Sequence, residues 1–140
     1  MDSFFYSAVS DVLVGAGTST QLGDLAASMG IQRALIVTDP GIIKFGLLDG
    51  AVANLKANNI ELSIYSDVIA DPPESVVMDA VSSAQAFGCD GVIGFGGGSS
   101  MDVAKLLSVL IKGEQQLSEI YGVDQISGGR LPLIQVPTTA

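Results

Sequence analysis

The stretch GVIGFGGGSSMDVAK, residues 91–105, decides the fold of this protein. It begins with a continuous apolar run, residues 91–95, which is typical of a strand buried on both faces of a parallel sheet. Glycines and serines at residues 96–100 interrupt the run, and an apolar segment of helical length follows from about residue 101 to 111. That segment is apolar nearly all round, so we expect it to be packed on more than one side. A buried strand, a glycine-rich turn and a helix predict one unit of an α/β protein.

The rest of the sequence repeats this alternation. Strands are predicted at residues 11–14, 34–38, 61–65 and 133–136. Apolar side chains recur at helical spacing in three further segments: Leu22, Leu25, Ala26 and Met29; Leu48, Ala51, Val52 and Leu55; and Val77, Ala80, Val81, Ala84 and Phe87. Strands separated by helices require crossover connections. The expected fold is a mostly parallel sheet flanked by helices, Rossmann-like, with a short N-terminal β-hairpin element.

Composition limits the partners and the chemistry. The 140 residues have the length of one domain, and the 15 acidic against 6 basic side chains give a net charge of −9. Such a surface repels nucleic acids and anionic membranes, so neither is an expected partner. A single cysteine, with no signal peptide and no membrane-spanning apolar run, favours a cytoplasmic location.

The sequence contains no histidine. A histidine-ligated metal site, a Ser-His-Asp triad and a Cys-His pair are therefore excluded within these residues. We expect no catalytic residue and no metal ligand here.

The glycine-rich turn is the strongest candidate for a binding site. Ligands of open parallel sheets bind beyond the carboxyl ends of the strands. Gly97 and Gly98 let backbone N–H groups approach an anion, and Ser99 adds a hydroxyl donor, so the turn suits a pyrophosphate. The alternative is a tight strand–helix turn in which Ser99 and Asp102 form an approximate capping box. Lys105 is expected to pair with Asp102 rather than with a phosphate.

Other polar residues follow the ends of the neighbouring strands. Asp39, after the strand at 34–38, can accept hydrogen bonds from both hydroxyls of an adenosine ribose and would repel a 2′-phosphate, or it can cap the next segment. Asp71, before Pro72, is expected to cap the next helix and could also face a ribose. Thr138 and Thr139 follow the last strand and suit a phosphate or an adenine edge.

The remaining glycines and the cysteine are given structural roles. Gly15 and Gly17 are interpreted mainly as turn glycines, because Thr20 stands where the dinucleotide fingerprint needs its third glycine. Cys89 precedes a buried strand and is expected to be an inert core residue.

Residues 96–105 resemble the G-G-G-S-x-x-D-x-A-K motif of the iron-containing (group III) alcohol dehydrogenases. The likeness extends over nearly the whole chain. Residues 37–39 resemble that family's ribose-binding turn, residues 71–72 its Asn-Pro or Asp-Pro pair, and residues 136–140 its P-T-T-A segment.

The resemblance implies a usually oligomeric, two-domain enzyme that oxidises small alcohols or reduces aldehydes with NAD. By position, Asp39 would bind the adenosine ribose with Asp71 nearby, and Gly97, Gly98 and Ser99 would hold the pyrophosphate. Asp102 would lie beside it, and Thr138 and Thr139 would line the adenine side. NADP is a weaker expectation. The Fe²⁺ or Zn²⁺ ligands belong to a helical C-terminal domain that does not map onto these residues.

Residues 1–140 are therefore expected to be the NAD-binding part of a longer protein, and to be inactive alone. The alternatives are a relative of glycerol dehydrogenase or dehydroquinate synthase, which tend to differ at the position of Ser99, and a non-catalytic nucleotide-binding module.

Overall fold

The protein folds into a parallel sheet with helices on both faces. The computed structural model describes residues 11–12, 21–69, 71–113 and 129–138. The strands are β1 (Asp11–Val12), β2 (Arg33–Val37), β3 (Glu61–Tyr65), β4 (Gly91–Gly96) and β5 (Leu133–Pro137). They form one five-stranded sheet in the order β1-β5-β4-β2-β3, and every pair of neighbours is parallel. The expected α/β class and parallel sheet are confirmed.

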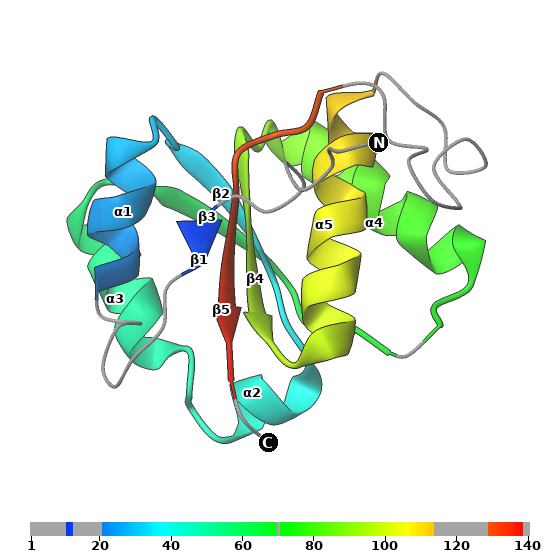
Figure 1. The fold of residues 1–140 in the computed structure, drawn as a ribbon, viewed down its shortest axis with the longest axis horizontal. Coiled ribbons are helices and arrows are strands. Elements are labelled where there is room, and N and C mark those ends of the chain that lie inside the picture. The colour runs from blue at the N-terminus through cyan, green and yellow to red at the C-terminus, as the bar shows by residue number, and fades with distance from the viewer. Residues whose placement is uncertain (1–10, 13–20, 70, 114–128, 139–140) are drawn as a thin grey trace, which may run out of the picture.

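The helices divide between the two faces of the sheet (Figure 1). They are α1 (Leu22–Ser28), α2 (Pro40–Lys44), α3 (Asp49–Ala57), α4 (Glu74–Phe87) and α5 (Gly98–Lys112). Helices α1 and α3 cover one face, α4 and α5 cover the other, and the short α2 lies below the carboxyl ends of the strands. Within the described part of the chain, none of these helices has the length and apolarity that crossing a bilayer requires.

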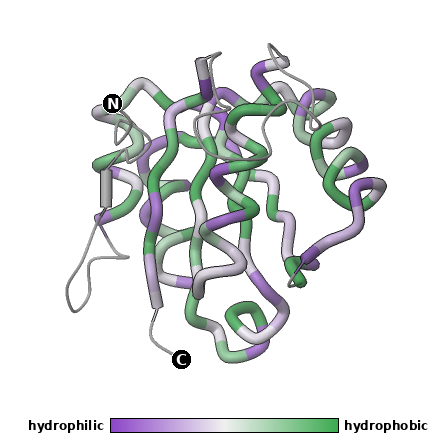
Figure 2. Tube along the Cα trace, turned by 45° about the vertical axis from the view of Figure 1, so that its right-hand side comes forward, coloured by the Kyte–Doolittle hydropathy of each residue, from purple (hydrophilic) through white to green (hydrophobic). Residues whose placement is uncertain are grey.

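Two apolar clusters form the core, one on each side of the sheet. Successive residues of β2 alternate between them, since Ala34 and Ile36 face α1 and α3 whereas Leu35 and Val37 face α4 and α5. All six residues of β4 are buried, because this strand has neighbours on both edges and helices on both faces. In Figure 2 the helices alternate between hydrophobic and hydrophilic positions along the tube, as one-sided packing requires.

The predicted helical stripes are confirmed. Leu22 and Ala26 of α1, Ala51 and Leu55 of α3, and four predicted positions of α4 are buried. Helix α5 packs against β4, β5, β2 and α4, as expected for a helix that is apolar nearly all round.

Two helices differ from prediction. Helix α5 begins at Gly98 rather than near Met101, and a short helix, α2, begins at Pro40, where a loop was expected at residues 39–41. Of the predicted first strand, residues 11–12 are described and pair with β5, while residues 13 and 14 lie outside the described residues. The expected β-hairpin and the turn glycines Gly15 and Gly17 also lie outside them.

Candidate functional site

The order of the strands points to the carboxyl ends of β2 and β4 as the candidate binding site. From β2 the chain continues outward to β3 and then returns to the other side of β2 to form β4. This reversal is the topological switch point, where the loops leaving two adjacent parallel strands diverge to opposite faces and open a crevice. Asp39 follows β2 and the glycines 97–98 follow β4, so the two strongest sequence candidates lie together at this edge of the sheet.

Hydrogen bonds fix the ends of the three central strands relative to one another. The buried hydroxyl of Thr38, directly after β2, donates to the carbonyl of Phe95 in β4 over 2.7 Å. The backbone N–H of Thr138, directly after β5, donates to the carbonyl of Gly96 over 2.9 Å. These two bonds hold the ends of β2, β4 and β5 together at one edge of the sheet.

Asp39 caps a helix with one carboxylate oxygen and leaves the other at the crevice. Its backbone is extended (φ −114°, ψ 164°), as expected before a proline, and its Oδ1 accepts the N–H of Ile42 over 3.0 Å at the start of α2. A Cβ added to Gly96 would lie 3.2 Å from its Oδ2. The capping alternative is thus confirmed for Oδ1, while Oδ2 lies beside the glycine turn in position to accept from a ligand.

The three glycines of the turn differ in what surrounds them. Gly96 has φ +145°, and a Cβ there would lie 2.9 Å from the Oγ of Ser100, so both its conformation and its surroundings require glycine. A Cβ at Gly97 or Gly98 would meet no described atom within 4 Å. Gly97 also has an ordinary φ of −86°. The fold therefore does not explain glycine at these two positions, whereas a ligand that approaches the backbone closely does.

The first turn of α5 presents free backbone donors to this open space. Gly97 is the N-cap of the helix and has no side chain to satisfy the orphan N–H groups of the first turn. Ser99 is exposed there. The free N–H groups and the positive end of the helix dipole suit an anion, as expected.

Two predictions about the side chains of this turn are wrong. The capping box of Ser99 and Asp102 does not form, because the helix begins at Gly98 and both residues already lie within it. Asp102 and Lys105 form no ion pair, although both are described, and Arg33–Glu61 is the ion pair that the structure shows in the described residues. Asp102 is thus left exposed beside the crevice.

The prediction that Asp71 caps α4 is also wrong. The helix begins at Glu74, and its N-cap is Pro73, which makes no side-chain cap. The reason is the double proline: Pro73 disfavours the helical region for Pro72, so the helix cannot start before it. Asp71 instead has φ +47°, a left-handed conformation that Asp tolerates better than most residues.

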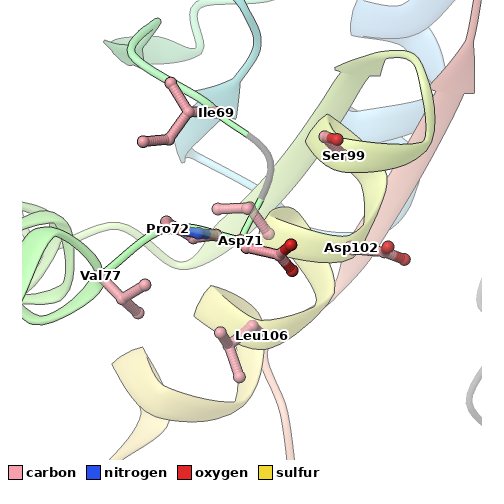
Figure 3. A pocket seen from close by; sticks show the side chains of 8 residues that line it. Ile69, Asp71, Pro72, Val77, Ser99, Asp102 and Leu106 are labelled. Atoms are coloured by element: carbon pink, nitrogen blue, oxygen red, sulfur yellow. The ribbon is translucent and has the colours of Figure 1, made fainter. Parts of the chain in front are cut away.

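Asp71 and Asp102 line a cavity beside the glycine turn (Figure 3). The cavity measures about 380 Å³ and is lined by the β3–α4 connection, the first turn of α4 and the first three turns of α5. Its walls also include Ser99 and five apolar side chains: Ile69, Pro72, Val77, Val103 and Leu106. Three residues predicted to bind a ligand are thus brought together here. The carboxylates disfavour a phosphate inside the cavity and favour hydroxyl, amino or cationic groups.

Thr138 and Thr139, the last two residues predicted to bind a ligand, follow β5. Thr138 lies at the carboxyl edge beside Gly96, to which its N–H is bonded. Thr139 lies outside the described residues.

Burial raises the pKa of two groups. Burial, with a smaller effect of Asp67, raises the pKa of Tyr65 at the end of β3. Burial, followed by the charge of Asp90, raises the pKa of the Cys89 thiol. A buried thiol that resists ionisation is a poor nucleophile, which agrees with the expected core role of Cys89. Among the described residues, no three acidic or cysteine side chains are grouped so as to hold a metal ion.

Sequence reasoning did not identify Thr38 and Gly96 as the residues that join the strand ends. The signal for Thr38 is a hydroxyl at the end of an otherwise apolar strand, since a buried hydroxyl needs a partner. Ser100 was also missed; its Oγ is buried and has no hydrogen-bond partner among the described residues.

Comparison with known proteins gives consistent matches. The family model described as iron-containing alcohol dehydrogenase matches residues 10–140. The chain is 32% identical over 138 residues to sulfoacetaldehyde reductase of Bilophila wadsworthia, and 34% identical over 129 residues to choline dehydrogenase of Bacillus subtilis. These alignments cover 99% and 90% of this chain but 36% and 32% of the relatives, so the chain spans about a third of their length.

Solved structures show the same fold. The NADH-dependent butanol dehydrogenase A of Thermotoga maritima superposes with a TM-score of 0.82 at 31% identity, covering 99% of this chain and 35% of the other. A 1,3-propanediol oxidoreductase superposes with a TM-score of 0.84 at 26% identity, covering 94% of this chain and 36% of the other.

Proposed function

Because the chain belongs to the iron-containing alcohol dehydrogenase family, we propose that residues 1–140 form the NAD-binding α/β domain of an alcohol or aldehyde oxidoreductase. The observation that carries the proposal is the meeting of Asp39 with the glycine turn at the switch point. A Cβ at Gly97 or Gly98 would meet no described atom within 4 Å, and the free Oδ2 of Asp39 lies 3.2 Å from where a Cβ of the adjoining Gly96 would stand.

A dinucleotide satisfies each part of this edge. Its pyrophosphate accepts from the N–H groups of the first turn of α5 and from Ser99, where the helix dipole favours negative charge. Its adenosine ribose donates to the free oxygen of Asp39. Asp71 and Asp102 offer acceptors to uncharged or cationic parts of the ligand in the adjoining cavity. Thr138 and Thr139 complete the edge on the β5 side, next to the adenine.

The carboxylate of Asp39 is the reason why we propose that the site binds NAD rather than NADP. A carboxylate that accepts from the 2′-hydroxyl of NAD would face the 2′-phosphate of NADP and repel it. The domain contains 15 acidic side chains against 6 basic ones, so its overall field also disfavours the additional phosphate.

Catalysis is assigned to the longer protein. When bound, NAD supplies the site that accepts or donates hydride. The sequence has no histidine, and the described residues offer no metal cluster, so the residues here do not fit the family's iron or a zinc ion and we assign them no metal-dependent step. We expect residues 1–140 to bind NAD without oxidising alcohols when Fe²⁺ or Zn²⁺ is added.

The proposed setting is a cytoplasmic homo-oligomer that acts on a small alcohol or aldehyde. A single buried cysteine suits a reducing compartment, and related proteins are named for sulfoacetaldehyde, choline and butanol. Light scattering of the purified longer protein tests the oligomeric state.

The test is calorimetric titration with NAD and NADP of the wild type, Asp39→Asn and Asp39→Ala, with Asp79→Asn on the exposed face of α4 as control. Asp39→Asn keeps an acceptor for the N–H of Ile42 but removes the charge. Losing charge-assisted bonds to a ribose costs about 1.5–3 kcal/mol, or roughly ten- to hundredfold in Kd for NAD. Affinity for NADP is expected to fall less.

Asp39→Ala also removes the cap of α2, which lowers stability by about 0.5–2 kcal/mol. Comparing the two variants separates loss of binding from loss of structure. Equal affinity of the wild type for NAD and NADP, or unchanged NAD binding by Asp39→Asn, would overturn the assignment of Asp39.

A further inference from the structure

Gln135 of β5 reaches across the sheet to the helix that carries the proposed pyrophosphate site. Strand β4 lies between β5 and β2, and α5 covers the face of the sheet on which α4 also lies (Figure 1). The side-chain Nε2 of Gln135 donates to the carbonyl of Met101 over 2.9 Å. Met101 follows Gly98 and Ser99 by less than one turn of α5. This hydrogen bond therefore ties the sheet to the end of the helix that presents the anion-binding N–H groups.

Space for this side chain comes from a glycine in β4. A Cβ at Gly94 would overlap the Oε1 of Gln135 and would lie 2.8 Å from the Cβ of Ala104 in α5. No larger residue fits at position 94 while Gln135 keeps its conformation. Gly94 and Gln135 are register partners in adjacent strands, so they form one packing unit beneath α5.

The amide of Gln135 is not explained by stability. Its Oε1 is buried and has no hydrogen-bond partner among the described residues. A buried acceptor without a partner destabilises the folded state, so an apolar side chain of the same size would be more stable here. The Met101 carbonyl would still have its partner within the helix. The useful part of the amide is thus its donor, which fixes the first turn of α5.

We propose that Gln135 is a positioning residue for the pyrophosphate site, acting through Met101 to hold the first turn of α5 in its binding orientation. The inference rests on the proposed function. Without the bond the helix end samples other orientations, and the apparent Kd rises in inverse proportion to the fraction of molecules that remain competent. Replacing Gln135 by methionine removes this donor, because the methionine side chain has about the length of glutamine but cannot donate a hydrogen bond.

The primary test is Gln135→Met, titrated with NAD, with ADP, which carries a pyrophosphate, and with adenosine, which carries none. Loss of one neutral hydrogen bond predicts a Kd about three- to tenfold higher for NAD and ADP. Adenosine affinity is expected to be unchanged, and the melting temperature unchanged or higher. A structural role alone would lower the melting temperature and leave the ratio of ADP to adenosine affinity unaltered.

A double variant separates packing from positioning. Gly94→Ala alone is expected to destabilise the protein. Adding Gln135→Ala removes the overlap with the amide and recovers part of the melting temperature, while the contact of the new Cβ with Ala104 remains. The double variant should nevertheless bind ADP as weakly as Gln135→Met. Recovery of wild-type ADP affinity in the double variant, or wild-type affinity of Gln135→Met, would overturn the positioning role. Failure of the wild type to bind NAD and ADP would instead overturn the proposed function, and this inference with it.

Discussion

Replacing Gly98 by alanine is expected to stabilise the protein and weaken NAD binding. Gly98 is the first residue of α5, and an added Cβ meets no described atom within 4 Å. Alanine at a compatible position stabilises by about 0.4–1 kcal/mol, because it restricts the unfolded chain and favours the helix. For a domain of this size the melting temperature should rise by roughly 1–4 °C.

The same methyl group occupies the space in which a phosphate would approach the backbone. Losing one charge-assisted hydrogen bond from a backbone N–H costs about 1.5–3 kcal/mol, so the Kd for NAD should rise by at least tenfold. Urea denaturation and calorimetric titration measure the two effects on one preparation. Gly50→Ala, at an exposed glycine in the first turn of α3, is the control for helix propensity. A Gly98→Ala protein that is more stable and binds NAD as well as the wild type refutes the ligand explanation of this glycine.

Two further predictions concern stability. Gly23→Ala should lower the free energy of unfolding by about 1–3 kcal/mol, measured by urea denaturation. The new Cβ would lie 2.6 Å from the carbonyl carbon of Asn54 in α3 and would disturb the 2.6 Å bond from the Gly23 N–H to Asn54 Oδ1. A loss under about 0.5 kcal/mol would contradict the close packing of α1 on α3. Burial raises the pKa of Cys89 and of Tyr65, so both neutral forms stabilise the fold. This stabilisation is complete below the ordinary pKa values of about 8.5 and 10, and it is lost as the pH rises further. Between pH 7 and 10.5, the urea midpoint should therefore fall less steeply in Cys89→Ala than in the wild type.

Much of the fold was predictable because its signals are local. Buried parallel strands must be apolar along their length, which identified β2, β4 and β5, and one-sided helices must repeat their apolar residues, which identified α1, α3 and α4. The site followed from the same logic, since carboxyl ends of parallel strands share one edge. Asp39 and the glycine turn could therefore be placed together without knowledge of the strand order.

The errors arose where local signals compete. Asp39-Pro40 is typical both of a turn and of a helix start, and five residues are too few for periodicity to decide, so α2 was missed. The glycines concealed the start of α5, because Gly98 and the serines lie inside the helix despite their poor helix propensity. At Asp71 the N-cap pattern was outweighed by the effect of one proline on another.

The contacts that sequence could not reveal are those between distant residues. The sequence near Gly94 does not indicate that glycine is needed there to leave room for Gln135, which lies 41 positions further along the chain. Nor does it indicate that Gln135 bonds to Met101, 34 positions before it. Likewise, the bond from Thr38 to Phe95 spans 57 positions. Such contacts depend on the strand order, which alternating strands and helices leave open.

The glycines of residues 94–98 therefore have separate physical causes, although in sequence they form one motif. Gly94 leaves room for a side chain from the next strand, and Gly96 adopts a backbone conformation that other residues rarely adopt. Gly97 and Gly98 satisfy neither condition, and at Gly98 the fold alone would favour alanine. A glycine that destabilises its own helix, and whose added Cβ would meet no described atom, is explained by an external group that needs the backbone exposed. This difference between neighbouring glycines, rather than their number, is the structural argument for a dinucleotide at this edge.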